Sequence, residues 1–412
     1  MSTPIVVVGA GHAGVHTASR LVELGYRGEL ILIDEEDGLP YERPPLSKDV
    51  LASAESHEPP ALRKQDYYED KGIRRIAGSA VTAVDRSARE VCLADGSTIP
   101  YHRLILATGS RARTLDVPGA ALPGVQVLKT RADGHNLKAM LRPGVRFVIV
   151  GAGYIGMEVA AAAVKSGCSA TVLEYQDRSM SRVTSEDVSR YFENLHVGEG
   201  VRFAFGSSLE RIEGSDRVEG IVTSDGETIP ADVVVVGVGV LPNQDLAEAA
   251  GLDCSDGIVV DEHARTSDPE IYAVGDVTRF TCPREGVSMR LECVQNAMAQ
   301  ADSAARHIRG LDAAVAEVPW FWTVQHGVRL QTAGVRSPED QVVRRGDPAD
   351  GKFAVLYLRD GRLAALDTIN ALGDFAAGKK LIAAGARLDP VLAADRAVKL
   401  ATTRTDALAT SR

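Results

Sequence analysis

Strand-sized apolar runs alternate with helix-sized segments over the first three quarters of the chain. Two stretches share one form: "IVVVGAG" at 5–11 and "VIVGAG" at 148–153 each lead from an apolar strand through a glycine turn into a helical segment. Each helix is followed by a strand that ends in acid, "ELILIDEE" at 29–36 and "ATVLE" at 170–174. Alternating strands and helices predict parallel α/β architecture with two separate βαβ units.

The last quarter of the chain has another pattern. "KFAVLYL" and "RLAALDTI" flank Asp360-Gly361, which predicts a β-hairpin with a two-residue turn. Two helices are expected to follow, near 371–385 and 389–401, and "RLECVQNAMAQADSAARHI" at 290–308 predicts another helix before the hairpin. The expected fold class is therefore α/β with two Rossmann-like domains, followed by a C-terminal α+β domain.

The two glycine turns have the spacing of dinucleotide-binding loops. In Gly9-x-Gly11-x-x-Gly14 the first glycine allows the tight turn, the second lets backbone approach a pyrophosphate, and the third lets the helix pack on the strand. Gly151, Gly153 and Gly156 repeat this order. Amides and the positive end of a helix dipole then face the anion. Two complete motifs predict two bound dinucleotides.

The acid after each glycine loop predicts which dinucleotide binds. Glu174 ends the second unit with no arginine directly after it, so it can accept hydrogen bonds from both ribose hydroxyls and repel a 2′-phosphate. This favours NADH over NADPH, although Arg178 and Arg182 stand close by in the sequence. The first unit offers two acids, Asp34 and Glu35, and its dinucleotide is expected to stay bound.

Composition excludes several function classes. A chain of 412 residues predicts two or three domains, and a formal charge of −10 argues against nucleic acid as a partner. The five cysteines form no CxxC or CxxxxC pair, which argues against a local redox dithiol, a metal site or a disulfide framework. With no export signal or membrane-length apolar run visible, the expected location is cytoplasmic, with no membrane span.

Several longer motifs carry a family resemblance: "LPYERPPLSK" (39–48), "ATGSRAR" (107–113), "GAGYIGMEVA" (151–160), "TSDPEIYAVGDV" (266–277), "RLECVQNAMAQA" (290–301) and "VPWFW" (318–322). Together they resemble the flavoprotein superfamily of glutathione reductase. More closely, they resemble the NADH-dependent ferredoxin reductases of bacterial cytochrome P450 and ring-hydroxylating dioxygenase systems. The resemblance implies a discontinuous FAD domain at 1–112 and 244–318, an NAD domain at 113–243 and a C-terminal domain at 319–412.

The resemblance also implies FAD contacts. Glu35 is expected to bind the FAD ribose, with Asp34 as the alternative, and Lys48 to lie by the flavin and the diphosphate. Asp276 is expected at the ribityl chain, and Trp322 close to the isoalloxazine. A helix starting near Val294 is expected to point its N-terminus at flavin N1 and O2, where negative charge gathers on reduction. The full expected FAD set is Gly9, Gly11, His12, Ala13, Gly14, Glu35, Arg43, Pro44, Lys48, Val81, Ala107, Thr108, Gly109, Lys129, Gly275, Asp276, Val294 and Trp322.

The second loop is expected to hold NADH, with Glu158 near the nicotinamide carboxamide and Lys48. Lys48, Glu158 and Trp322 are therefore the expected catalytic residues, in a hydride transfer that needs proximity more than acid–base chemistry. The expected NAD set is Gly151, Gly153, Tyr154, Ile155, Gly156, Glu158, Glu174 and Gly239. No metal site is expected.

The electron acceptor follows partly from a missing residue type. Disulfide reductases of the superfamily have cysteine on the helix after the FAD ribose acid, whereas residues 36–60 contain none. Electrons are therefore expected to pass from FAD directly to a docked protein or a quinone. The resemblance favours an acidic 2Fe–2S ferredoxin that binds transiently and supplies a P450 or a ring-hydroxylating oxygenase. Rubredoxin, a quinone, another small acceptor and an NADH-sensing redox-switched flavoprotein remain alternatives.

Two departures from the family pattern concern FAD and partner binding. Lys129 stands in "LKT" where the family commonly has arginine, which keeps the charge and loses the bidentate fork. Asp302-Ser303 stand where basic residues often face the ferredoxin. The basic docking candidates are accordingly Arg306 and Arg309, followed by Arg344-Arg345 and Lys379-Lys380.

Overall fold

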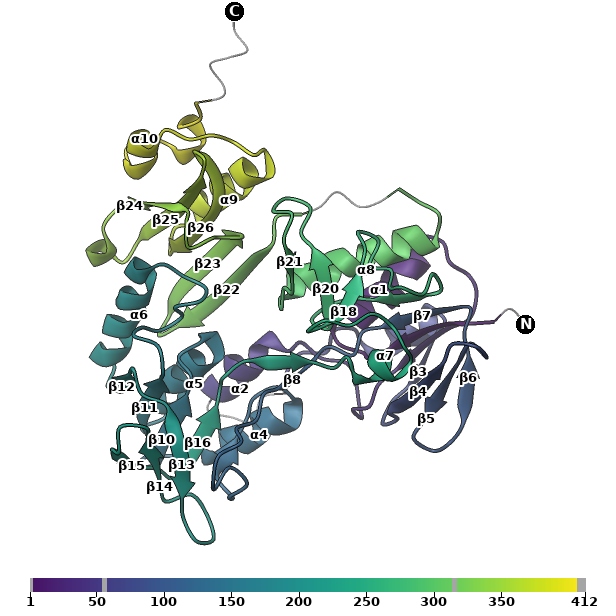
Figure 1. The fold of residues 1–412 in the computed structure, drawn as a ribbon, viewed down its shortest axis with the longest axis horizontal. Helices are drawn as coiled ribbons and strands as arrows, with labels where there is room; N and C mark the ends of the chain where they lie inside the picture. Colours follow the sequence, from purple (N-terminus) through teal and green to yellow (C-terminus); the bar gives the residue numbers. More distant parts are fainter. Residues whose placement is uncertain (1–2, 54–57, 313–316, 406–412) are drawn as a thin grey trace, which may run out of the picture. The chain divides into compact units, whose positions relative to one another are not determined.

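The computed structural model describes residues 3–53, 58–312 and 317–405 (Figure 1). Within it the chain forms two compact units, each built from three stretches. The first unit comprises Met1–Arg43, Pro59–Arg111 and Val240–Glu317, and the second comprises Pro44–Glu58, Ala112–Gly239 and Val318–Arg412. In the described ranges, every helix is too short or too polar to cross a lipid bilayer.

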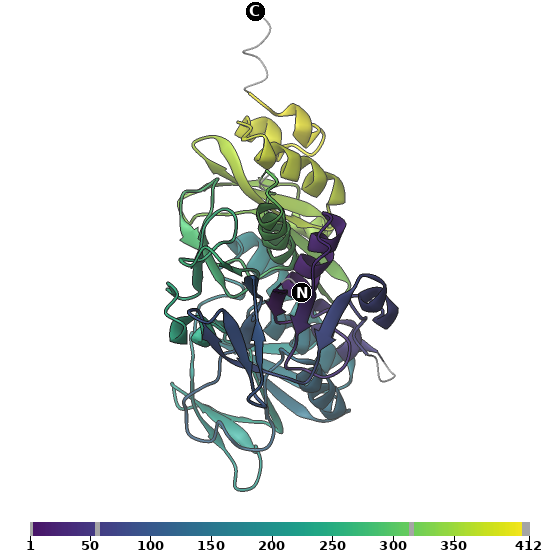
Figure 2. The same ribbon diagram turned by 90° about the vertical axis from the view of Figure 1, so that its right-hand side faces the viewer.

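The first unit is built on a five-stranded parallel sheet in the order β19-β7-β1-β2-β3. Its strands are β1 (Ile5–Val8), β2 (Leu30–Ile33), β3 (Ile73–Ile76), β7 (Arg103–Leu106) and β19 (Ile271–Ala273). Helix α1 (His12–Glu23) and helix α8 (Val294–Ile308) lie side by side in both views (Figure 2). Helices α3 (Gln65–Asp70) and α7 (Asp245–Ala249) complete its helical elements.

The sheet of the first unit is covered on both faces, so its central strands β1 and β2 are apolar at every position, whereas the edge strand β3 contains Arg74 and Arg75. Ile5 and Val7 of β1 pack into one core with residues of α1 and α8, while Val6 and Val8 pack into a second core. The second core is shared with two small sheets. One is antiparallel, with β4 (Val81–Asp85), β5 (Glu90–Leu93) and β6 (Thr98–Pro100), and the other contains β18 (Ile258–Val260), β20 (Thr278–Thr281) and β21 (Ser288–Met289).

The second unit contains a parallel sheet of the same design, in the order β12-β11-β10-β16-β9. Its strands are β9 (Val125–Gln126), β10 (Arg146–Val150), β11 (Ser169–Glu174), β12 (Val201–Phe205) and β16 (Val233–Val236). Its helices are α4 (Arg131–Met140), α5 (Tyr154–Lys165) and α6 (Glu186–Gly198). These helices pack on one face of the parallel sheet. A small antiparallel sheet packs on its other face and contains β13 (Leu209–Glu213), β14 (Gly220–Thr223) and β15 (Thr228–Pro230).

The end of the chain forms an antiparallel sheet in the order β22-β23-β26-β25-β24. Its strands are β22 (Trp320–Gln325), β23 (Val328–Gly334), β24 (Gln341–Arg345), β25 (Phe353–Arg359) and β26 (Arg362–Ile369). Helices α9 (Leu372–Ala383) and α10 (Pro390–Ala394) follow (Figure 1). Buried residues of this sheet share one core with the parallel sheet of the second unit, among them Leu330 and Phe353.

Short elements complete the fold. The segment that carries the "RPPLSK" motif forms a 3-10 turn, η1 (Pro44–Ser47), and a short helix, α2 (Asp49–Ala52), in the second unit. Strands β8 (Ser110–Ala112) and β17 (Val240–Pro242) form a two-stranded pair where the chain passes between the units. Two more 3-10 turns, η2 (Pro348–Asp350) and η3 (Leu400–Thr402), lie near the C-terminus.

Most predicted elements are present, with shifts at two helices. The hairpin β25–β26 turns at Asp360 and Gly361, both with positive φ, as the Asp-Gly dipeptide predicts. The helix predicted for 290–308 begins only at Val294, and residues 290–293, between β21 and this helix, are irregular. The helix predicted for 389–401 is wrong in extent: α10 ends at Ala394, and η3 follows after a break. The three-domain division with its boundaries remains a prediction.

Candidate functional site

The first glycine loop has the geometry that a pyrophosphate requires. Gly9 has φ +101°, and a Cβ there would lie 2.2 Å from the carbonyl oxygen of Ala107. A Cβ on Gly14 would lie 1.9 Å from the carbonyl oxygen of Gly9. At Gly11, by contrast, an added Cβ would meet no described atom within 4 Å. Helix α1 starts after Gly11 without a side-chain cap, so its first amides point into this open space.

The second glycine loop repeats this geometry position by position. A Cβ on Gly151 (φ +104°) would lie 2.5 Å from the oxygen of Gly237, and one on Gly156 would lie 2.1 Å from the oxygen of Gly151. At Gly153 the space within 4 Å again holds no described atom. Helix α5 also begins without a side-chain cap. In each loop, two glycines are required by the fold itself, and the middle one leaves room for a ligand's phosphates.

The strand ends around the first loop bring together predicted and unpredicted residues. Ser110 Oγ donates to Asp276 Oδ2 at 3.0 Å. Gln300 of α8 accepts from the amide of Gly275 at 2.8 Å and from Thr278 Oγ1 at 2.9 Å, which fixes the turn before Asp276. Gln300 and Ser110 were not predicted as site residues, because neither residue type stands out in the sequence on its own.

The turn at Thr108-Gly109 is held by a residue that the sequence analysis missed. Asn243 Nδ2 donates to the oxygen of Thr108 at 2.8 Å, while Thr108 Oγ1 donates to the oxygen of Asn243 at 2.8 Å. The amide of Asn243 donates to the oxygen of Gly109 at 3.0 Å. Three hydrogen bonds thus fix the backbone of Thr108 and Gly109, two predicted FAD contacts.

Three consecutive acids follow β2, and their environments differ. Asp34 is half-buried, and burial raises its pKa to about 6. The hydrogen bond from the backbone amide of Glu36 acts in the opposite direction and lowers the pKa. Glu35, the predicted ribose ligand, is exposed. Glu36 accepts from Tyr41 Oη at 2.9 Å and from Arg43 Nη2 at 2.7 Å, which explains how Arg43 is positioned. The choice of Glu35 over Asp34 as ribose ligand remains a prediction.

His12 opens α1 directly after the glycine loop. Burial lowers the pKa of His12 to about 4; Arg43 lowers it further, while Asp276 opposes the shift. His12 is therefore neutral at physiological pH. Ala13 beside it is buried, and a Cβ on Gly275 would lie 2.9 Å from the Cβ of Ala13, which explains glycine at 275.

In the second unit, Lys48 and Glu158 form an ion pair. Lys48 Nζ lies 2.9 Å from Glu158 Oε1 and 3.0 Å from Oε2. The Glu158 side chain is 1% exposed, whereas that of Lys48 is 20% exposed. Ser47 Oγ and Thr323 Oγ1 also donate to the Glu158 carboxylate. A buried carboxylate with three donors is held in one orientation.

A line of buried polar side chains continues from Glu158 to the C-terminal sheet. Gln325 Nε2 donates to Thr323 Oγ1 at 3.3 Å, and Gln325 Oε1 lies 2.9 Å from His196 Nε2. His196 Nδ1 lies 3.2 Å from His326 Nε2. Burial lowers the pKa of His196 to about 4, so the ring is neutral and can donate through one nitrogen and accept through the other. None of these four residues was predicted from the sequence.

Glu174 ends β11 beside the second glycine loop. It is 9% exposed; Oε2 accepts from the amide of Ala152 at 2.8 Å and Oε1 from the amide of Gln176 at 3.0 Å. Each carboxylate oxygen keeps a free lone-pair direction for a ribose hydroxyl. The glycine loop and the acid are thus joined directly, as a ribose-binding role for Glu174 requires.

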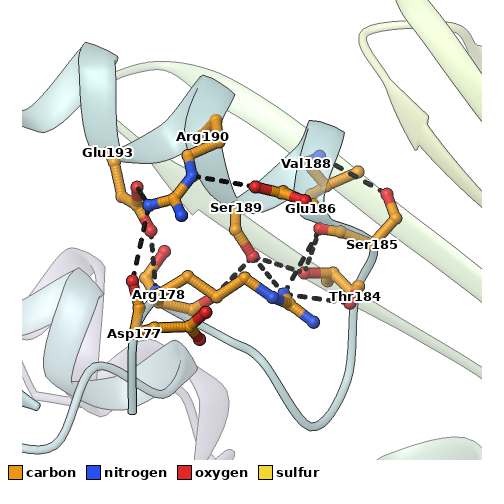
Figure 3. Close-up of polar contacts among 10 residues, drawn as sticks. Asp177, Arg178, Thr184, Ser185, Glu186, Val188, Ser189, Arg190 and Glu193 are labelled. Atoms are coloured by element: carbon orange, nitrogen blue, oxygen red, sulfur yellow. Dashed lines mark hydrogen bonds and ion pairs between the residues drawn. The ribbon is translucent and has the colours of Figure 1, made fainter. Parts of the chain in front are cut away.

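Arg178 stands close to Glu174 in the sequence and could have favoured NADPH, but its guanidinium donates to residues between β11 and α6 and to Ser189 of α6 (Figure 3). Its Nη1 donates to Ser189 Oγ at 2.6 Å and to the oxygen of Thr184 at 3.2 Å, and its Nη2 to the oxygen of Ser181 at 2.9 Å. Arg182 is exposed.

The other predicted contacts occupy varied environments. Trp322 lies half-buried on β22 opposite Gln331, and the neighbouring Phe321 packs on Tyr154, with ring centroids 4.5 Å apart. Ile155 is 42% exposed at the start of α5. Val294 is the first residue of α8, as predicted. The remaining members are Pro44 in η1, half-buried Val81 at the start of β4, buried Ala107, Lys129 before α4, and Gly239, whose φ is +101°.

One predicted docking residue is corrected by the structure. Arg345 is 3% exposed and donates to Asp374 Oδ1 and to the backbone oxygens of Ala393, Asp395 and Val398. It ties the C-terminal segment together and cannot meet a partner protein. Asp302 is also occupied internally, since it accepts from Arg20 of α1.

Comparisons with known proteins agree with this geometry. The family model described as "Pyridine nucleotide-disulphide oxidoreductase" matches residues 3–301, and "Reductase C-terminal" matches 320–404. "Probable ferredoxin reductase CtmF" of Castellaniella defragrans is 46% identical over 92% of this chain and 93% of its own. Rhodocoxin reductase of Rhodococcus erythropolis is 41% identical over 95% and 92%.

A solved structure is similar over the whole chain. The covalent complex of putidaredoxin reductase with putidaredoxin contains a chain that is 36% identical, with a TM-score of 0.95 and coverage of 100% of both chains. The predicted resemblance to ferredoxin reductases and the predicted fold class are confirmed by these matches. The chain therefore belongs to the pyridine nucleotide-disulphide oxidoreductase family and also contains a region that matches the reductase C-terminal family.

Proposed function

We propose that this protein is an NADH-dependent ferredoxin reductase that binds FAD at the first glycine loop and NADH at the second. The observation that carries the proposal is the repeated loop geometry. In both loops an added Cβ is blocked at the first and third glycines and free at the middle one, next to the uncapped start of a helix. Phosphates need this combination of space and free amides.

The side chains supply positioning and charge. Bound FAD supplies the chemistry, since it accepts a hydride and releases two electrons singly. Glu174 accepts from the adenosine ribose of NADH, and its charge disfavours a 2′-phosphate. Lys48 and Glu158 hold each other in place, and the carboxylate, fixed by Ser47 and Thr323, orients the nicotinamide carboxamide. Orientation of this kind lowers the barrier without proton transfer.

The proposed acceptor is a 2Fe–2S ferredoxin that supplies a cytochrome P450 or a ring-hydroxylating oxygenase. Two facts support it. One relative is named a probable ferredoxin reductase and another rhodocoxin reductase, and one similar structure is a complex of putidaredoxin reductase with putidaredoxin. Residues 36–60 hold no cysteine that could pass electrons through a thiol. A cytoplasmic location, expected from the sequence, stays a prediction.

Spectroscopy and turnover test the proposal. The purified protein should be yellow, and anaerobic NADH should bleach its flavin absorbance with one equivalent per FAD. NADH-driven reduction of cytochrome c should then depend on an added 2Fe–2S ferredoxin. A colourless protein that takes up no FAD would contradict the cofactor assignment. Equal turnover with rubredoxin or a quinone in place of ferredoxin would contradict the acceptor.

A further inference from the structure

The loop at 175–185, between Glu174 and α6, occupies a position that determines nucleotide choice in dinucleotide-binding folds. There, a nearby arginine accommodates the 2′-phosphate of NADPH. This loop contains Arg178, yet its guanidinium donates to Thr184 and Ser189 (Figure 3), and also to the backbone oxygen of Ser181. Those hydrogen bonds occupy donors that a phosphate would otherwise use.

The near end of the loop is fixed to the nucleotide site. The amide of Met180 donates to the oxygen of Ala152 at 2.9 Å, and the amide of Ser179 donates to Glu193 Oε1 at 2.7 Å. Arg190 holds that carboxylate through Oε2 at 2.8 Å (Figure 3). The amide of Ala152 also donates to Glu174, so this one residue contacts both the loop and the ribose acid.

The far end of the loop is held by the C-terminal sheet. The amide of Ser185 donates to Tyr357 Oη at 2.9 Å, and Tyr357 Oη donates to Asp367. Arg336 Nη2 donates to the oxygen of Ser181 at 3.0 Å, the same oxygen that Arg178 uses. Tyr357 is 1% and Asp367 3% exposed. A polar pair this deeply buried is costly to break, so it constrains the loop strongly.

We infer that Tyr357, Asp367 and Arg336 are positioning residues for nucleotide choice: they hold the 181–185 turn in the form that keeps Arg178 bonded inside the loop. A nucleotide with a 2′-phosphate then meets the Glu174 carboxylate without the Arg178 guanidinium to balance the charge. The choice of NADH thus depends on the C-terminal antiparallel sheet as well as on the parallel sheet that carries the second glycine loop. This inference rests on the proposed binding of NADH at the second glycine loop.

Two variants of the FAD-loaded protein test the inference. Tyr357→Phe removes only the hydroxyl that holds Ser185, and Ser189→Ala removes the side-chain acceptor of Arg178. Calorimetric titration with adenosine 2′,5′-bisphosphate and with 5′-AMP isolates the 2′-phosphate. Both variants should raise the affinity for the bisphosphate relative to 5′-AMP by at least about tenfold, the effect of one gained charge-assisted hydrogen bond. The kcat/KM ratio of NADPH to NADH should rise in parallel.

Matched controls separate nucleotide choice from general loosening. Adding Arg178→Ala to Tyr357→Phe should abolish the gain, whereas adding Arg182→Ala should leave it. Tyr272→Phe, which removes another buried tyrosine hydroxyl bonded to His307 at 2.8 Å, should leave the ratio unchanged. An unchanged ratio in both test variants, or a gain that persists without Arg178, would overturn the inference. Failure of the unaltered protein to bind 5′-AMP or to be bleached by NADH would instead refute the proposed function.

Discussion

Lys48 and Glu158 form an ion pair with a nitrogen–oxygen distance of 2.9 Å, although 110 positions separate them in the chain. Lys48 precedes a short helix, and Glu158 lies in the first turns of α5. The pair therefore connects the "RPPLSK" segment to the helix that follows the second glycine loop. Because the Glu158 carboxylate is buried, its hydrogen-bond partners determine both its orientation and the free energy that its burial costs.

Replacing Lys48 by Met should be more harmful than replacing both partners. The single variant leaves a buried carboxylate without its cation, which should lower the free energy of unfolding by about 3 kcal/mol. Lys48→Met together with Glu158→Gln should recover much of this loss. Urea denaturation measures both effects, and equal loss in the single and double variants would contradict the pairing. Hydride transfer from NADH, followed by flavin bleaching in stopped flow, should be slow in either case.

Thr323→Val tests the polar line behind Glu158. Valine keeps the shape but removes the hydroxyl that donates to Glu158 and accepts from Gln325. Leaving these buried groups unsatisfied should lower the free energy of unfolding by about 1–3 kcal/mol. Thr323→Ser, which keeps the hydroxyl, is the matched control and should lose less. Equal losses in the two variants would show that packing and not hydrogen bonding matters at this position.

The glycine loops give a paired prediction. Gly11→Ala should fold normally but bind FAD weakly, because the added methyl meets no described atom and projects into the phosphate space. Gly14→Ala should impair folding itself, since its Cβ would lie 1.9 Å from a backbone oxygen. Thermal melting and FAD titration separate the two outcomes. In the second loop, Gly153→Ala should retain FAD but raise the KM for NADH, and Gly156→Ala should lower the melting temperature.

His196 should make folding stability depend on pH. Burial lowers its pKa to about 4 in the folded protein, against an unperturbed value of about 6.5. The unfolded chain therefore binds the proton first, so stability is complete above pH 6.5 and is lost as the pH falls towards 4, by about 3 kcal/mol at most. His196→Gln should flatten this part of the stability curve in urea denaturation. If the difference in free energy of unfolding between the unaltered protein and His196→Gln did not change between pH 6.5 and pH 4, a buried neutral histidine would be contradicted.

Local patterns carried the predictions that succeeded. The glycine spacing, the acid at the end of each second strand and the Asp360-Gly361 turn depend on residues close together in the chain. Each reflects a backbone requirement that few other residues meet, such as the positive φ at Gly9 and Gly151. The middle glycines, Gly11 and Gly153, have negative φ and could be recognised only from the spacing of the motif.

The residues that were missed have partners far away in the sequence. Thr323 meets Glu158 across 165 positions, and Asn243 meets Thr108 across 135. Ser, Thr, Asn and Gln occur at many surface positions, so their type alone does not reveal a buried role. Arg345 was misjudged for a related reason: two adjacent arginines indicate an exposed basic patch, but β-strand alternation turns one of them inward.

The division of each unit into three stretches of chain has a consequence for how the protein is made. The first unit needs α8, which starts at Val294, to pack on α1, and the second needs the C-terminal sheet to complete its core. During synthesis on a ribosome, both units therefore stay incomplete until most of the polypeptide has emerged. The first unit can be completed only after the stretch that ends at Glu317, and the second only after the C-terminal sheet, so nucleotide capture comes late in translation.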